Sequence, residues 1–476
     1  MSITATSGSF VEEWAKAQKL RAPTLTADPS SSIFQRNLEA ELDANRSQHL
    51  CAMFHVASLP VDFSSCDVVS LGSSGLVKKA FLQELSDNPD FVLGSQGTRP
   101  LNGNSAYLET VEREIAEFHG AETALIVVSG AVANDAIFAV VRPGDAIVYD
   151  ELVHASTHYG MKNSLALIQK PFKHNSVSAF IDTLNAVREE SVLIREGKRS
   201  VIIAVESFYS MDGDICPLKE LVAAAKRIFP GGNAQFVVDE AHSTGNIGPK
   251  GAGLVNLLGL EKEIAIRNHT FGKSLSGVGA AILCSHSVRS MLINQAKPIL
   301  FSTAPSFPII APTRAAYKML KAGATVKPQE KVQHLIKLFM EEMTENPIWD
   351  KANDSGFLRI PLYEEDDWES VPFVSQICPV WTKAKHNLYL AVHLQLAGFN
   401  VYPISFPVVP KGTDRIRLVF HAHNTDDDVR RLAKEICGWA KETMECEVQN
   451  RMQNLTGEKV KMCKAARHAV GLVQAA

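Results

Sequence analysis

The side chain with the clearest potential for covalent chemistry is Lys273, which lies in the run T-F-G-K-S-L-S-G from Thr270 to Gly277. A lysine amine attacks a carbonyl carbon once it has lost its proton. Burial and a neighbouring cation both lower the pKa of a lysine, and small residues around it let a cofactor approach the backbone. On its own, the run is more typical of a surface lysine in a Gly/Ser loop, so its interpretation depends on other residues.

A carboxylate that could work with Lys273 is Asp239, in the run V-V-D-E-A-H-S-T-G that ends an apolar segment. An aspartate at this place can keep a pyridine nitrogen protonated, and His242 follows three residues later. Two other interpretations are a carboxylate that caps the next turn and a helicase D-E-A-H motif. A helicase needs a phosphate loop of the type G-x-x-x-x-G-K-[ST], and the sequence has none. The pairing of Asp239 with Lys273 favours a cofactor site.

These residues need secondary structure that brings them together. From about residue 95 to 325, short apolar runs alternate with amphipathic segments such as Leu218–Ile228. This alternation predicts an α/β fold with a large, mostly parallel sheet covered by helices on both faces. Ligands bind at the carboxyl ends of the strands in such sheets, which is where the two motifs fall. The expected buried strands are Ala124–Val128, Ala146–Tyr149, Leu165–Ile168, Val201–Val205, Gln235–Val238 and Ala280–Cys284.

The chain on either side of this region differs in pattern. Residues 1–90 form an N-terminal segment, which we assign to a small domain, and residues 91–328 form the large domain. Residues 329–446 form a smaller α+β domain with helices expected at Lys331–Glu345 and Asp426–Thr443 and an acidic loop at Glu364–Glu369. Residues 447–476 are a polar and then Ala-rich tail. A further helix is expected at Phe10–Leu20.

Composition excludes several classes of function. The formal charge of −4 over 476 residues gives no basic surface for nucleic acid. Apolar stretches such as Ala124–Val128 are soon interrupted, the next one by Asn134 and Asp135, so no membrane span is expected. The N-terminus lacks the apolar core of a secretory signal. We therefore expect a cytoplasmic protein.

Metal and redox sites have little support. The eight cysteines form no C-x-x-C pair, which argues against zinc ribbons and dithiol redox sites and fits free thiols in a reducing compartment. His421 and His423 have H-x-H spacing without a third ligand nearby in sequence. We interpret them as core or substrate-channel histidines and expect no metal.

With these motifs in order, the chain resembles the α-oxoamine synthases, a branch of the fold-type I enzymes that use pyridoxal 5'-phosphate (PLP). It resembles especially the fungal 8-amino-7-oxononanoate synthase-like proteins. The resemblance runs from about Asp62 to Leu432, and although each motif is weak alone, their order is specific. Besides the two motifs above, they are Gly94–Arg99 with Gly103–Ser105, Ser129-Gly130, Asp150–Ser156, Glu206–Asp214, Phe301–Ala304 and Pro410–Arg417.

The resemblance implies a role for each motif residue. Lys273 would form the Schiff base with PLP and move the proton at the substrate α-carbon, and Asp239 would pair with the pyridine nitrogen. His154 would stack on the cofactor ring. Arg417, with Arg415 as a second candidate, would bind the amino acid carboxylate through a planar fork. The other implied cofactor contacts are His242 and Ser210 at the phenolic oxygen, the Gly130 and Ala131 amides and Thr270 at the phosphate, and Ser302 and Thr303 at the phosphate of a partner subunit, which implies a homodimer.

Three positions depart from the family pattern. The asparagine that helps to hold the substrate carboxylate is Cys66 here, and a thiol is a far weaker hydrogen-bonding group. The aromatic residue that often follows Ser-Gly is Ala131, and the usual A-A-H-T reads A-H-N-T at Ala422–Thr425. These changes leave the cofactor chemistry intact and affect the substrate.

The implied reaction joins an amino acid to an acyl thioester with loss of carbon dioxide and gives an α-amino ketone. The thioester is either acyl-CoA or a chain on a polyketide synthase carrier domain, with Cys66 and Ala131 favouring a specialised substrate. The alternatives are biotin-pathway synthesis of 8-amino-7-oxononanoate from alanine and a pimeloyl thioester, an aminotransferase on the same fold, and a non-catalytic partner subunit. An NAD enzyme has the least support, because no G-x-G-x-x-G follows a strand.

Overall fold

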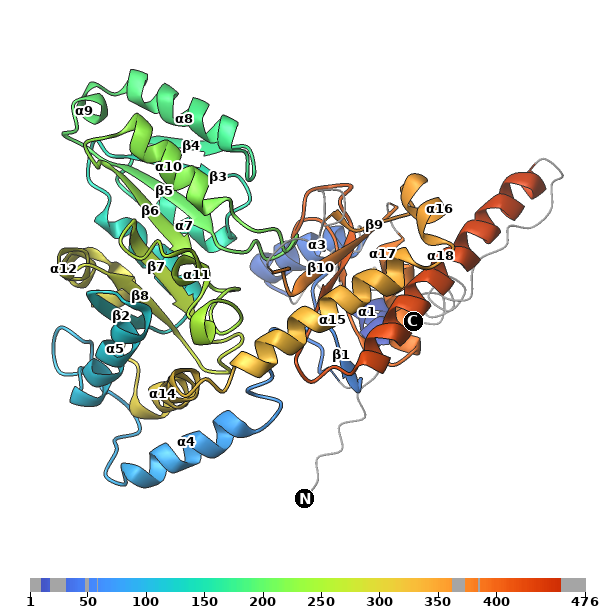
Figure 1. Cartoon of the computed structure of the whole chain (residues 1–476), viewed down its shortest axis with the longest axis horizontal. Coiled ribbons are helices and arrows are strands. Elements are labelled where there is room, and N and C mark those ends of the chain that lie inside the picture. Colours follow the sequence, from blue (N-terminus) through green and yellow to red (C-terminus); the bar gives the residue numbers. More distant parts are fainter. Residues whose placement is uncertain are drawn as a thin grey trace.

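The computed structural model describes residues 10–17, 31–47, 51–57, 59–361, 373–383 and 386–454. These residues form two lobes, and the long helix α15 (Val326–Thr344) runs from the larger lobe into the smaller one (Figure 1). The expected acidic loop at Glu364–Glu369 lies outside the described residues. The family fold expected from the sequence is confirmed by these two lobes and by the sheet of the larger one.

The larger lobe contains a seven-stranded sheet in the order β2-β8-β7-β6-β5-β3-β4. Strands β7, β6, β5, β3 and β4 are parallel, and β8 is antiparallel to both of its neighbours, so β2 runs in the same direction as β7. The carboxyl ends of six strands therefore lie at one edge. The strands are β2 (Thr123–Val127), β3 (Ala146–Asp150), β4 (Ile168–Phe172), β5 (Val201–Glu206), β6 (Ala234–Asp239), β7 (Ile264–Thr270) and β8 (Ala280–Cys284).

Helices cover both faces of this sheet because its strands are apolar on both sides. In β2, Leu125 and Val127 pack in one core cluster with α6 and α12, whereas Ala124 and Ile126 pack in another with α5 and α14. Alternate strand side chains point to opposite faces, so both faces are buried. The helices of this lobe are α4 (Leu76–Asp87), α5 (Ala106–His119), α6 (Gly130–Ile137), α7 (Ala155–Lys162), α8 (Val177–Glu190), α9 (Val192–Arg195), α10 (Leu218–Ile228), α11 (Leu254–Leu258), α12 (His286–Gln295), α13 (Lys297–Leu300) and α14 (Phe307–Lys321).

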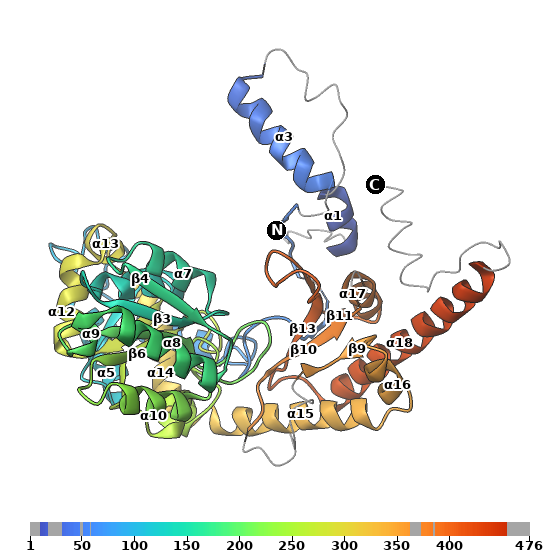
Figure 2. The ribbon, with the colours of Figure 1, turned by 90° about the horizontal axis from the view of Figure 1, so that it is seen from above.

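The smaller lobe combines an antiparallel sheet, β12-β13-β10-β9, with a parallel pair formed by β1 and β11. Its strands are β1 (Val61–Asp62), β9 (Leu358–Arg359), β10 (Ile377–Thr382), β11 (Phe399–Asn400), β12 (Pro403–Ile404) and β13 (Arg415–Val419). Its helices, besides α15, are α16 (Trp349–Asp354), α17 (Asn387–Leu396) and α18 (Asp426–Asn454). Two N-terminal helices, α1 (Phe10–Ala17) and α3 (Ile33–Ser47), complete the described chain, and α3 stands away from both lobes in Figure 2.

Two expectations about elements were wrong. The run Leu165–Ile168 is not a strand: β4 begins at Ile168, and Leu167 is 93% exposed. Because β4 is an edge strand, its residues are mostly half-buried and do not form an apolar run. Helix α18 also continues to Asn454, past the expected end at Thr443.

Candidate active site

Lys273 follows β7 and is half-buried in the structure. Its Nζ lies 2.8 Å from Nε2 of His242, which follows the neighbouring strand β6. Burial lowers the pKa of Lys273, although the Asp239 carboxylate opposes this shift. Burial and the Lys273 charge together hold the pKa of His242 well below its usual value, so this imidazole is neutral and can accept a hydrogen bond from the lysine amine. Burial therefore shifts the amine toward its neutral, nucleophilic form.

Asp239 ends β6 and is held by three donors. Its Oδ2 accepts from the side-chain amide of Asn134, at 2.8 Å, and from that of Asn268, at 3.4 Å, while its Oδ1 accepts from the Ala241 N–H at 2.9 Å. These hydrogen bonds fix the position of the carboxylate. An ionised acid at this place can keep a nearby pyridine nitrogen protonated.

His154 caps the N-terminus of α7. Its Nδ1 accepts from the Ser156 N–H at 3.2 Å and lies 2.7 Å from the Ser156 hydroxyl, so its ring proton belongs on Nε2. Its backbone N–H donates to the buried Glu206 carboxylate. Partial burial lowers the pKa of His154, so the ring is neutral. A neutral ring with a fixed backbone can stack on a flat partner.

An anion cradle lies where β2 turns into α6. The Ser129 side chain caps this helix by accepting from the Val132 N–H at 3.1 Å, and the helix begins at Gly130. A Cβ added to Gly130 would lie 2.2 Å from the Thr270 hydroxyl oxygen, so only glycine leaves this approach open. Backbone N–H groups at a helix N-terminus together with a threonine hydroxyl suit a phosphate.

Gly130→Ala should therefore weaken PLP binding, because the new methyl group would displace the Thr270 side chain from the cradle. We expect the dissociation constant of PLP to rise about 10-fold or more, equivalent to the loss of one or two hydrogen bonds to a charged group. Fluorescence titration of the apoprotein with PLP measures this. Gly231→Ala is the matched control, because the nearest atom to its added Cβ is 3.9 Å away. Equal PLP affinity in both variants would contradict the assignment of the cradle.

The two arginines of β13 have different surroundings. Arg415 is 1% exposed, its guanidinium is paired with Asp212, and it lies 4.4 Å above the Trp381 ring. Arg417 is half-buried, and its Nε donates to the Ser210 carbonyl oxygen. The Arg417 charge also contributes to the lowered pKa values of Lys273 and His242, so it lies near them. The geometry favours Arg417 for a substrate carboxylate and gives Arg415 a structural ion pair.

The remaining predicted residues border the site. The Cys66 carbonyl accepts from the Ser274 hydroxyl at 3.5 Å, one residue from Lys273. Ala131 is exposed in the first turn of α6. Ser302 and Thr303 line a small hollow beside Val127 and Val132, and Thr303 forms a β-bridge with Thr98.

Sequence reasoning assigned no role to three site residues. Asn134 was used only as evidence against a membrane span, and Asn268 lies in the polar strand β7, yet both hold Asp239. Glu206 is fully buried; burial and the adjacent Asp239 raise its pKa well above the usual range. For Asn134 and Glu206 the signal was a polar residue inside or at the end of an apolar element, whereas the polar sequence of β7 gave no such signal for Asn268.

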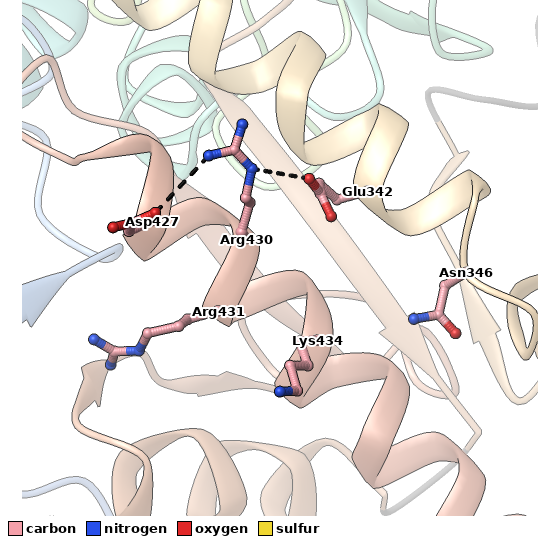
Figure 3. A pocket seen from close by; sticks show the side chains of 6 residues that line it. All are labelled: Glu342, Asn346, Asp427, Arg430, Arg431 and Lys434. Carbon is pink, nitrogen blue, oxygen red and sulfur yellow. Dashed lines mark hydrogen bonds and ion pairs between the residues drawn. The ribbon is translucent and has the colours of Figure 1, made fainter.

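A separate cavity of about 410 Å³ lies between α15 and α18 and shares no residue with this site. In Figure 3 the Arg430 side chain lies between Glu342 and Asp427, with ion-pair distances of 3.1 and 3.8 Å. These contacts neutralise much of its charge. No group of three or more potential metal ligands occurs among the described residues.

The chain matches the family described as aminotransferase class I and II over residues 62–436. It is 47% identical to the aminoacyl transferase sphA of Aspergillus fumigatus over 479 aligned residues, which cover 99% of each chain. It is 40% identical to the 8-amino-7-oxononanoate synthase of Emericella nidulans, over 80% of this chain and 90% of that one. This chain belongs to the α-oxoamine synthase family.

The fold of this α-oxoamine synthase is shared with a serine palmitoyltransferase from S. paucimobilis with bound PLP, with a TM-score of 0.69, 22% identity and coverage of 86% of this chain and 98% of the other. The enzyme uses PLP and is an acyltransferase, so the alternatives of an aminotransferase, a non-catalytic subunit and an NAD enzyme fall away. The residues present fit PLP, since the Gly130 cradle, the Asp239 carboxylate and the Lys273 amine follow β2, β6 and β7 at one edge of the sheet. None of the described helices is long and apolar enough to cross a membrane.

Proposed function

We propose that this α-oxoamine synthase joins a small amino acid to an acyl thioester other than the pimeloyl thioester of biotin synthesis. The observation that carries the proposal is the extent of similarity. Residues 1–61 and 437–476 lie outside the family match, yet similarity to the aminoacyl transferases spans 99% of the chain, whereas that to the Emericella 8-amino-7-oxononanoate synthase spans 80%. Cys66 and Ala131 support the proposal because both are smaller than the usual side chains near the substrate.

Four side chains of the site have separate roles in the proposed reaction. Arg417 binds the amino acid carboxylate with the guanidinium N–H groups that remain beside its bond to Ser210. Lys273, whose pKa is lowered by burial and whose amine lies 2.8 Å from the His242 ring, takes the α-proton and returns it after carbon dioxide has left. PLP, when bound, delocalises the electron pair that the lysine leaves at the α-carbon. Asp239 sustains that delocalisation, and His154 stacks on the ring.

A homodimer and a carrier-borne acyl chain are parts of the same proposal. Exposed apolar side chains lie in, or within four residues of, the segments that line a groove of about 680 Å³, which come from residues 87–96, 102–107 and 305–307. They are Val92 (63% exposed), Leu93 (75%), Leu101 (83%) and Phe301 (79%). A second copy would cover this surface. The thioester would come from CoA or from a polyketide synthase carrier domain, and we place the enzyme in the cytoplasm.

The test is the release of thiol and carbon dioxide by holoenzyme given glycine, alanine or serine with pimeloyl-CoA or palmitoyl-CoA. We expect equal amounts of the two products and a kcat/KM for the long-chain thioester at least about 10-fold higher, since several methylene groups separate the substrates. Cys66→Asn, which restores the usual side chain of the family, is the matched variant. It should reduce the ratio of kcat/KM for palmitoyl-CoA to kcat/KM for pimeloyl-CoA. Activity with alanine and pimeloyl-CoA alone would instead assign the enzyme to biotin synthesis.

A further inference from the structure

A charged clamp outside the reacting groups lies at the carboxyl ends of β3 and β4. Its centre is His174, whose Nδ1 lies 2.8 Å from the buried Asp150 carboxylate and whose Nε2 contacts the Asp214 carboxylate. Because both ring nitrogens face carboxylate oxygens, both must donate, and the ring carries a positive charge. Burial would lower the pKa of His174, but the two carboxylates raise it to about 10.

Neighbouring groups complete this clamp. Asn175, whose φ is 50°, donates its backbone N–H to Asp150 at 2.9 Å and its side-chain amide to Asp214 at 2.8 Å. The Tyr209 ring meets the His174 ring edge-on, with 4.4 Å between centroids. Two carboxylates from separate segments are therefore tied to one dipeptide.

Asp214 belongs to the loop 207–216, so its contacts with His174 and Asn175 hold this loop in place. The Tyr209 N–H donates to the Asp214 carbonyl at 3.1 Å, and the Gly213 N–H donates to the Tyr209 carbonyl at 2.9 Å, so the loop is closed at its base. A Cβ added to Gly213 would lie 2.1 Å from the carbonyl oxygen of Ile377 in β10, so the loop also packs tightly on the smaller lobe.

The tip of this loop holds both arginines of β13. Asp212 pairs with Arg415, and the Ser210 carbonyl accepts from Nε of Arg417. We propose that His174 is a positioning residue that, through Asp214 and the loop 207–216, sets the orientation in which Arg417 binds the substrate carboxylate. This inference rests on the proposed function through the role of Arg417.

The test compares two ligands of the holoenzyme, alanine and ethylamine, which share an amine but differ in the carboxylate. The ratio of their dissociation constants, followed by the visible spectrum, measures carboxylate recognition. In His174→Gln we expect this ratio to fall about 10- to 100-fold, as a displacement near 1 Å would cause, with ethylamine binding changed less than twofold. Asp214→Asn keeps the side-chain volume and the His174–Asp150 contact and should show the same loss.

His393→Gln is the matched control, since His393 is also 20% exposed and lies 2.8 Å from the Glu435 carboxylate. In an Arg417→Gln background, His174→Gln should reduce the ratio no further. Equal weakening of both ligands, or an unchanged ratio in both variants, would overturn the inference alone. A wild-type enzyme that does not distinguish alanine from ethylamine, nor glycine from methylamine, would overturn the role of Arg417 and the inference with it.

Discussion

Lys273→Ala should reduce the rate of thiol release by about 10⁴-fold or more, because the variant loses both the covalent attachment of PLP and the group that moves the α-proton. Among the described residues, no second lysine is bonded to His242; Lys250, for example, donates to the Lys321 carbonyl. Borohydride treatment followed by peptide mass analysis should fix PLP to Lys273 in the wild-type enzyme and to no residue in the variant.

Two further variants serve as controls for the loss of activity in Lys273→Ala. Lys273→Arg keeps a positive charge but cannot lose its proton, so it should be as inactive as Lys273→Ala. Lys250→Ala should retain full activity. An active Lys273→Arg enzyme would show that charge alone is needed at this position and would remove the assigned role in proton transfer.

Asp239→Asn should lower kcat about 10²- to 10³-fold, because the amide has no charge with which to hold the pyridine nitrogen protonated. The fold should be unaffected, since the Oδ atom that remains can still accept from Ala241 or Asn134. The measurement is the rate at which α-deuterated alanine loses its α-deuterium to water. This rate isolates the step at which the ring delocalises charge. The pH dependence of the visible band gives a second readout of the ring nitrogen.

Asp135→Asn is the matched control for this variant. It lies on the same helix, α6, as Asn134, and its carboxylate accepts a long bond of 3.3 Å from Asn163. Its activity should stay within twofold of the wild type. If Asp239→Asn exchanged the α-proton as fast as the control, Asp239 would be a structural cap and not the partner of the cofactor.

Much of the fold could be predicted where burial and apolar character coincide. Helix Leu218–Ile228 and strand Ala280–Cys284 have the predicted bounds, and Ala146–Tyr149 and Val201–Val205 are each one residue short. Strand β7 was missed because Arg267, Asn268 and His269 make its sequence polar, although all three are buried. Their partners come from distant segments: Thr244 contacts His269, and the His119 carbonyl accepts from Arg267.

In the site, too, some features could be predicted from the sequence and others depend on contacts between distant segments. Motif order predicted Lys273, Asp239 and His154, and the structure brings each to the carboxyl edge of the sheet. The spacing of Arg415 and Arg417 puts both on one face of β13, but the sequence cannot say that Asp212 occupies only one of them. Which arginine pairs with Asp212 depends on the path of the loop 207–216, in which Asp212 lies 203 residues before Arg415 in the chain. Packing of this loop against the smaller lobe sets that path.

The pairing of β1 with β11 has a consequence for how the chain is made. Val61 lies opposite Phe399 and Asp62 opposite Asn400, and the His421 ring lies 3.0 Å from the Asp62 carbonyl. The early segment that carries Cys66 therefore obtains its partners only after most of the chain has left the ribosome. The strands from β2 to β8 can pair before then. Synthesis thus favours an order in which the large sheet assembles first and the substrate side of the site is completed last.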